Sequence, residues 1–365
     1  MDSLLRRRPT AVLDDLRASP LLFLARRVYA WTQSPAPVPH DQPSPTDIRI
    51  VCIADTHNTH SAQPPLPEGD ILLHAGDLTQ SGTLPELCDA LAWLSVQPHP
   101  IKIFIGGNHD GALAEPETRA YIRQAYPALT YLENDVVQVT VRHHTLRIYG
   151  SPYTPQYGIW AFQYPRFPPS HPHLSNAVHT VDHHPAVVLW SAVPPQTDVL
   201  VTHGPPLGHL DHSAGCAALL STLWRVRPRL HVFGHIHAAR GVERVRWDDV
   251  QPAFEAVCAY ADIHADVGMR ARWAQFVTLV WRAVTAKLSA WWWGRRARQV
   301  WGRETVLVNA ASVGDDHGLG GEEGGQRREV VVKDTEVGWQ DAQSWQERSC
   351  RRRSHETTLA SSKAP

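Results

Sequence analysis

Residues 48–58 read IRIVCIADTHN, an almost continuous apolar run that ends directly in Asp55 and His57. Strands this apolar are buried on both faces, as in the central sheets of layered α/β domains, whereas one-sided sheets alternate apolar and polar positions. The stretch therefore predicts a buried strand in a layered α/β fold, with two polar side chains at its carboxyl end.

Similar apolar runs recur along the chain and are separated by longer segments. They lie at 71–75, 101–106, 198–202, 230–234 and 305–310. Two of the separating segments, 83–97 and 115–126, have the character of covering helices, and Thr83 with Glu86 three positions later is typical of a helix start. This alternation predicts an α/β domain in which helices cover the sheets.

Five of these predicted strands end in residues that can bind a metal ion. The residues are Asp55, His57, Asp77, Asn108, His109, His203, His235 and His237. Because functional groups gather where the strands of an α/β sheet end, we expect these side chains to converge in one crevice. Carboxylate, amide and imidazole donors together suit Mn, Fe or Zn, and they are numerous enough for two ions that share a carboxylate such as Asp77.

The last of these strand ends, HVFGHIH at 231–237, carries two of the histidines. If the chain stays extended there, alternation sends His235 and His237 to one side and Ile236 toward the core. Any single histidine among the 22 in this chain is more often a surface or hydrogen-bonded residue than a ligand. The joint occurrence of polar residues at five strand ends favours the metal site.

The ordered motifs resemble those of the calcineurin-like metallophosphoesterase superfamily. They are Asp55-x-His57, Gly76-Asp77, Gly107-Asn108-His109-Asp110, His203-Gly204 and Gly234-His235-x-His237. The resemblance spans about 47–240 and resumes at 306–312. GDILLHAGDLT (69–79), GSPYTPQYGIWAFQY (150–164) and TDVLVTHGPPLGHLD (197–211) are similar to the metallophosphoesterase-domain-containing (MPPED-type) metallophosphodiesterases and their fungal relatives.

The resemblance implies a fold of two β-sheets packed as a sandwich and flanked by helices, with a dimetal site at the strand ends. It implies one metal ion held by Asp55, His57, Asp77 and His237, and a second held by Asp77, Asn108, His203 and His235. In this scheme a hydroxide that bridges the ions attacks phosphorus. The catalytic residues are then Asp77 and His109, the latter facing the leaving group.

The resemblance also implies hydrolysis of a small organic, nucleotide-like phosphodiester. A phosphomonoesterase or protein phosphatase is the alternative, but the phosphoprotein phosphatases carry a further Asp-Arg-Gly after the second motif, where this chain has GDLTQSG (76–82). Four residues are candidates for substrate contacts: Asn108, His109, Tyr153 and Trp160. The segment that holds Tyr153 and Trp160 could equally be a loop packed by its own aromatic side chains.

Composition indicates which partners and which cellular compartment to expect. A formal net charge of −1 and a pI near 7.1 give no reason to expect a nucleic-acid partner. The five cysteines are odd in number and form no CxxC pair, which favours a reducing compartment. The N-terminus is a poor secretory signal, because Asp14, Asp15 and Arg17 interrupt its apolar run. We therefore expect an intracellular protein, in the cytoplasm.

The chain divides into a catalytic domain and flanking segments. We expect an N-terminal amphipathic segment (1–33), a proline-rich linker (34–46), the catalytic domain (47–317) with a helical, tryptophan-rich insertion at about 240–303, and a disordered tail (318–365). The apolar stripe of 272–296 could pack on the catalytic domain or lie on a membrane surface, with 20–31 beside it. The second option allows another class of function, a membrane-surface or scaffold protein whose metal site is secondary.

Overall fold

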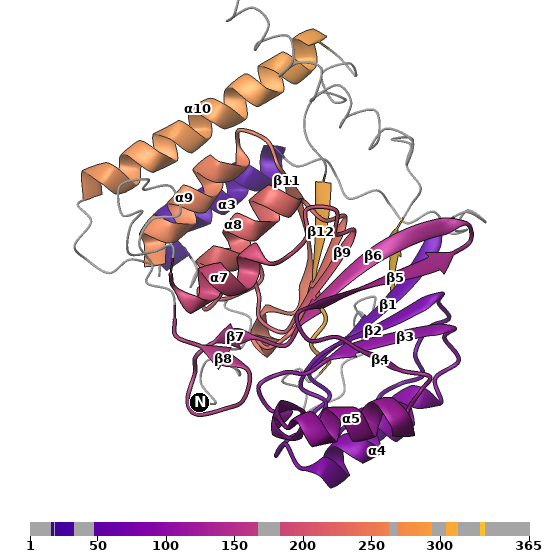
Figure 1. Cartoon of the computed structure of the whole chain (residues 1–365). Coiled ribbons are helices and arrows are strands. Elements are labelled where there is room, and N and C mark those ends of the chain that lie inside the picture. The colour runs from indigo at the N-terminus through magenta and orange to yellow at the C-terminus, as the bar shows by residue number, and fades with distance from the viewer. Residues whose placement is uncertain are drawn as a thin grey trace, which may run out of the picture.

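The computed structural model describes residues 16–17, 19–32, 47–166, 183–262, 269–293, 304–312 and 329–332. The predicted linker 34–46 and most of the predicted tail lie outside these residues. Two β-sheets stand face to face, with helices on their outer faces (Figure 1). This arrangement is the predicted layered α/β sandwich.

The first sheet has the strand order β13-β1-β2-β3-β4. Its strands are β1 (Ile48–Ile53), β2 (Ile71–Ala75), β3 (Ile101–Ile105), β4 (Thr130–Tyr131) and β13 (Glu329–Val332). From β1 to β4 neighbouring strands are parallel, so the carboxyl ends of β1, β2 and β3 meet at one edge. The short strand β13 pairs antiparallel with β1, although the sequence predicts disorder for that part of the tail.

The second sheet has the order β11-β12-β10-β9-β6-β5. Its strands are β5 (Asp135–Val141), β6 (His144–Ser151), β9 (Val199–Thr202), β10 (Leu230–Phe233), β11 (Gly241–Arg246) and β12 (Glu304–Asn309). The four central strands are parallel, and the antiparallel β5 and β11 form the edges. A two-stranded sheet, β7 (Thr154–Pro155) and β8 (Gln163–Tyr164), lies outside both.

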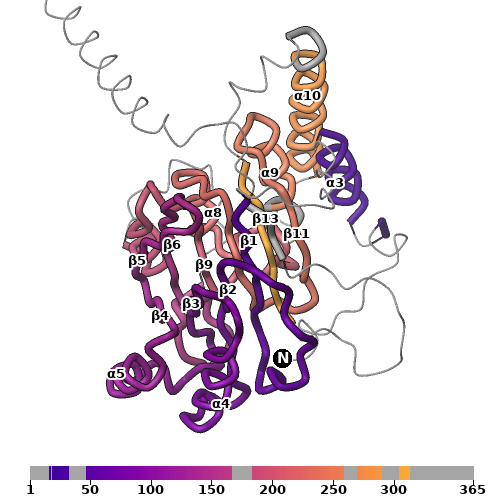
Figure 2. The backbone as a smooth tube through the Cα atoms, turned by 90° about the vertical axis from the view of Figure 1, so that its right-hand side faces the viewer, coloured from indigo at the N-terminus to yellow at the C-terminus, as the bar shows by residue number. Residues whose placement is uncertain are grey.

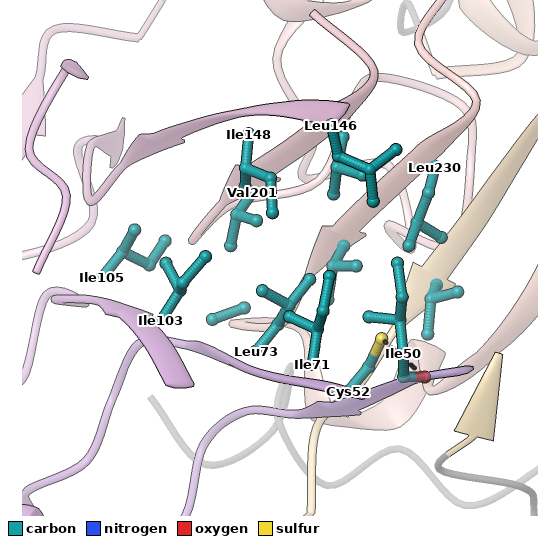
Figure 3. Packing of buried hydrophobic residues seen from close by; sticks show 14 of the residues in the cluster. Ile50, Cys52, Ile71, Leu73, Ile103, Ile105, Leu146, Ile148, Val201 and Leu230 are labelled. Carbon is teal, nitrogen blue, oxygen red and sulfur yellow. Dashed lines mark hydrogen bonds between the residues drawn. The ribbon is translucent and has the colours of Figure 1, made fainter. Parts of the chain in front are cut away.

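The inner faces of the two sheets form one apolar core. Ile50, Leu73 and Ile103 of the first sheet pack in one cluster with Ile148 and Val201 of the second (Figure 3). All five side chains are nearly inaccessible to solvent. Burial of aliphatic side chains in such a close-packed layer is the main favourable contribution to stability, and it makes both sheets a rigid base for the loops at their ends.

Helices cover the outer faces. The first sheet carries α4 (Leu84–Ser95) and α5 (Pro116–Ala125), and the second carries α7 (Pro185–Ser191) and α8 (Ala217–Val226). As the sequence predicts, Thr83 caps α4: its hydroxyl accepts from the backbone of Glu86, whose carboxylate accepts from the backbone of Thr83. Such a capping box stabilises a helix start by satisfying two backbone donors.

Three further helices form a separate layer. They are α3 (Pro20–Thr32), α9 (Gln251–Asp262) and α10 (Met269–Trp293), whose buried side chains form one cluster (Figure 2). The insertion for which the sequence predicts helical character thus begins with a strand, β11, because Gly241–Arg246 pairs with the edge strand β12. Among the described residues no helix combines the length and the apolar character needed to cross a bilayer.

Candidate metal centre

The ends of β1 and β10 bring together one group of three donors, Asp55, His57 and His237. His57 donates from Nδ1 to the carbonyl oxygen of Thr79 at 3.1 Å, so the Nε2 of the neutral ring carries a lone pair. That Nε2 lies 3.3 Å from Nε2 of His237, which lies 3.4 Å from Asp55 Oδ1. The two imidazoles and the carboxylate therefore converge as the ligands of one cation would.

The ends of β2, β9 and β10 bring together a second group, Asp77, His203 and His235. His203 donates from Nδ1 to the carbonyl oxygen of Ala75 at 3.0 Å, so its Nε2 is the ligand atom. This Nε2 lies 3.3 Å from Asp77 Oδ2 and 2.9 Å from Asn108 Oδ1. The amide oxygen of Asn108 thus joins the group, as the resemblance implies.

Asp77 lies between the two groups. Its Oδ2 is 3.5 Å from His57 Nε2 and 3.3 Å from His203 Nε2, while its Oδ1 accepts a hydrogen bond of 2.8 Å from the backbone of His109. The carboxylate is nearly inaccessible to solvent. A single oxygen that faces an imidazole nitrogen of each group has the position of a ligand shared by two ions.

Four of the candidate ligands have left-handed backbone conformations. The φ angles are 55° at Asp55, 39° at His57, 53° at Asp77 and 68° at His235. Residues other than glycine rarely adopt positive φ, and the strain costs on the order of 1–3 kcal/mol each. Such strain concentrates at functional sites, where it orients side chains that a regular strand would point elsewhere.

The stretch 231–237 does not stay extended, so the expected alternation of His235 and His237 is wrong. β10 ends at Phe233, His235 is left-handed, and His237 begins a short 3-10 turn. A side chain at Gly234 would overlap the carboxylate of Asp55, which instead accepts from the backbone of His235 at 3.0 Å. The two histidines still reach the cluster, one in each group, and Ile236 is buried as expected.

Burial and neighbouring charges determine the protonation of the cluster. Burial raises the pKa of Asp77, but the imidazoles of His203 and His57 together lower it more, to well below its usual range. Burial lowers the pKa of His203, yet Asp77 and Asp55 raise it to about 9. Burial and the neighbouring His203 lower the pKa of His235 to about 3, so His235 stays neutral, which is the form that binds a metal.

His109 lies at the rim of the cluster. It donates from Nδ1 to the carbonyl oxygen of Gln80 at 2.8 Å, and its ring meets the His57 ring edge-on at a centroid distance of 4.7 Å. The Trp160 ring stacks on it at 4.1 Å. Tyr153, the other aromatic candidate for substrate contact, instead packs edge-on against Phe162, in the apolar cluster between the first sheet and its covering helices. The structure therefore brings Trp160, rather than Tyr153, to the candidate site.

The family model described as calcineurin-like phosphoesterase matches residues 48–239, which is more than half of the chain and contains all of these ligands. The chain belongs to the calcineurin-like phosphoesterase family. This match confirms the family resemblance predicted from the motifs. The two sheets of the structure confirm the predicted sandwich fold.

Three curated proteins illustrate the similarity. The chain is 39% identical over 299 residues to "Probable rhamnogalacturonate lyase C" of Emericella nidulans, covering 80% of this chain and 25% of that protein. It is 37% identical to human "Metallophosphoesterase domain-containing protein 1", covering 56% of this chain and 66% of that protein. A UPF0046 protein of Caenorhabditis elegans is 34% identical, with coverages of 53% and 70%. The chain thus spans a quarter of the first relative and about two thirds of the other two.

One residue of this calcineurin-like phosphoesterase has a part in the site that the sequence did not indicate. Asp110 accepts from the backbones of Gly107 at 2.8 Å and Thr79 at 2.9 Å, and from the Thr79 hydroxyl at 2.8 Å. It therefore ties the loop after β3 to the loop after β2, which hold Asn108 and Asp77. Its position directly after Asn108 and His109 could have indicated a role in the site. The sequence alone does not show which role, because Thr79, whose backbone it accepts from, is distant in sequence.

Proposed function

We propose that this protein is a dimetal-dependent phosphodiesterase that hydrolyses a small organic phosphodiester. The observation that carries the proposal is the position of Asp77 Oδ2, 3.5 Å from His57 Nε2 and 3.3 Å from His203 Nε2, between two groups of donors. Family membership supports a phosphoester hydrolase. The donors, with imidazoles oriented by carbonyl partners and buried carboxylates, fit first-row ions such as Mn, Fe or Zn.

The residues of the cluster have distinct roles in this proposal. Asp55, His57, Asp77 and His237 hold one ion, and Asp77, Asn108, His203 and His235 hold the other. Bound there, two cations supply positive charge that lowers the pKa of a water molecule and neutralises the phosphoryl oxygens. The left-handed backbone of four ligands keeps their side chains oriented before substrate arrives, so little reorganisation is needed during reaction.

His109 donates a proton to the leaving oxygen in this account. Its Nδ1 is held by the Gln80 carbonyl oxygen, so the proton that it transfers comes from Nε2. The stacked Trp160 ring limits rotation of the imidazole and covers one of its faces. Of the four candidate residues, Asn108, His109 and Trp160 are better placed than Tyr153 to contact the substrate.

The charge around the cluster favours a diester. A phosphomonoester carries a charge of about −1.5 to −2 at neutral pH, whereas a diester carries only one negative charge. The motif loops 55–60, 76–82, 107–111, 203–213 and 234–240 together contain a single arginine, Arg240, and no lysine. A monoanionic substrate needs less additional positive charge than a dianionic one, so the scarcity of arginine and lysine in these loops supports the phosphodiesterase over the alternative phosphomonoesterase or protein phosphatase.

Paired hydrolysis assays test the proposal. With Mn²⁺ the purified chain should hydrolyse bis(p-nitrophenyl) phosphate faster than p-nitrophenyl phosphate. Asp77→Asn should lower the diester rate by about 100-fold or more, because the shared ligand contributes several kcal/mol of charge stabilisation. Asp135→Asn, at an exposed aspartate on β5, is the matched control and should leave the rate unchanged. Faster turnover of the monoester contradicts the diester preference, and normal turnover in Asp77→Asn removes Asp77 from the site.

A further inference from the structure

Helix α10 exposes an apolar stripe on one of its faces. Six large apolar residues are exposed among the described side chains of α10, and five of them form this stripe: Trp273 at 49%, Val277 at 61%, Trp281 at 67%, Val284 at 38% and Leu288 at 59%. Their spacing of four, four, three and four residues keeps them within an arc of about 80° of the helix circumference. They therefore form one continuous stripe, which we call the α10 stripe, and not scattered surface residues.

A different face of α10 already provides its packing. Leu279 and Ala283 are completely buried, and Leu279 belongs to the cluster that α10 shares with α3 and α9. One apolar face is sufficient to dock a surface helix on its domain, so the α10 stripe is a second apolar face that this packing does not explain. Contiguous exposed apolar patches of this kind mark interaction sites.

The stripe continues onto α3. Lys287 of α10 lies over the ring of Trp31 at 5.4 Å from its centroid, which brings the two helices side by side at this point. Trp31 is 54% exposed, and Leu24, two helical turns away on the same face of α3, is 41% exposed. The exposed apolar surface therefore combines residues from two segments separated by more than two hundred positions in the sequence.

The charges on these two helices all have one sign. Helices α3 and α10 carry six basic residues and contain no aspartate or glutamate: Arg26, Arg27, Arg270, Arg272, Arg282 and Lys287. Four of them, Arg26, Arg27, Arg270 and Arg282, are exposed. Arg282 lies 3.5 Å from the carboxylate of Asp249. An apolar surface with tryptophans and a positive border complements an anionic lipid surface.

The same charges disfavour a second copy of the chain as the occupant. A symmetric dimer through the α10 stripe would place one set of arginines against the other, and like charges across an interface are unfavourable. The helix layer also lies at the outer edge of the molecule, on the opposite side from α4 and α5 (Figures 1 and 2).

We propose that α10 and α3 form a platform that docks the enzyme on the surface of membranes rich in anionic lipid. Trp273, Trp281 and Trp31 lie at the level of the headgroups, and the arginines contact acidic headgroups. The helix rests on the bilayer rather than crossing it, which agrees with the absence of a membrane-crossing helix among the described residues. The platform acts independently of the metal centre.

Vesicle co-sedimentation of the full chain tests the platform. The wild type should bind vesicles of phosphatidylcholine mixed with phosphatidylserine. It should bind vesicles of phosphatidylcholine alone much more weakly. The triple variant Val277→Ser/Trp281→Ser/Leu288→Ser should bind at least about 100-fold more weakly, because three large apolar side chains no longer enter the interface. Arg270→Gln should weaken binding to the anionic vesicles about fivefold at low salt. Val96→Ser, at a 76% exposed valine after α4, is the matched control.

Each outcome decides for or against the platform. Full binding by the triple variant, equal binding to neutral and anionic vesicles, or no binding by the wild type overturns the proposal. A wild-type dimer in sedimentation equilibrium that the triple variant lacks, without vesicle binding, assigns the surface to a second copy instead. Hydrolysis of bis(p-nitrophenyl) phosphate should be unchanged in the triple variant, which shows that it is folded, and Asp77→Asn should still bind vesicles.

Discussion

Replacing His109 by alanine removes the proposed proton donor while leaving the metal cluster in place. The contact between this residue and Asp77 is made by the backbone N–H of residue 109, which donates to Asp77 Oδ1 at 2.8 Å and remains in the variant. The imidazole is lost, together with its bond to the Gln80 carbonyl oxygen, its stacking with Trp160 and its edge-on contact with His57. We therefore expect both ions to stay bound.

The size of the loss should depend on the leaving group. Transfer of a proton by a positioned side chain contributes about 100- to 10,000-fold to a rate, or about 3–5 kcal/mol of barrier. An alkoxide is a strong base that leaves only with a proton, so a diester of a simple alcohol should lose the full factor. p-Nitrophenolate is a weak base that leaves without one, so bis(p-nitrophenyl) phosphate should lose less than tenfold.

Turnover of both diesters is measured at saturating substrate, beside the metal content of each preparation. A His109→Ala variant that slows both substrates equally refutes general acid catalysis by this residue. Loss of bound metal in the variant would instead make His109 a ligand. The geometry allows this, because ligand atoms of His57, Asp77 and His109 also lie within 4.8 Å of one another.

Three further predictions follow from single contacts. Trp160→Ala removes a stacked pair that contributes about 1 kcal/mol, so kcat should fall about fivefold through a less ordered His109, and an unchanged kcat contradicts this role. Gly234→Ala drives a methyl group into Asp55, so calorimetric titration should find metal affinity lowered by about 10- to 100-fold; wild-type affinity would disprove the close approach. The buried His209 lies 3.1 Å from a carboxylate oxygen of Glu243 and 3.5 Å from one of Glu255. Burial lowers the pKa of His209, but these two glutamates raise it to about 10, so its contribution to stability is complete below about pH 6.5 and is lost as the pH rises toward 10. Thermal unfolding should therefore show the difference between wild type and His209→Gln shrinking across that range, and a constant difference would be evidence against the ion pairs.

Most of the central strands were predictable because their signal is local, whereas β6, which mixes polar and apolar residues, was not predicted. β1, β2, β3, β9, β10 and β12 are short apolar runs, and the capping box of α4 is visible in Thr83 and Glu86. The edge strands β5 and β11 were not predicted, because an edge strand is half-exposed and its polar positions resemble a loop. Pairing with a neighbour that is distant in sequence, and not composition, fixes these strands.

The members of the candidate site were predictable as a set, but their geometry was not. The motifs name the residue types, because aspartate, asparagine and histidine at strand ends suit a mixed-donor metal site. The left-handed backbone at Asp77 and His235 depends on tertiary hydrogen bonds, and local propensity disfavours it. The carbonyl oxygens of Thr79 and Ala75, which fix the tautomers of His57 and His203, likewise carry no signal in their side chains.

Metal content per chain tests the central claim most directly, since the account rests on one carboxylate shared by two ions. Elemental analysis of Mn²⁺-loaded protein should find two ions in the wild type and in Asp135→Asn. His237→Gln, which removes a ligand of one group only, should retain a single ion per chain. Asp77→Asn should retain less than one ion per chain. Two tightly held ions in Asp77→Asn, or none in the wild type, would contradict the account.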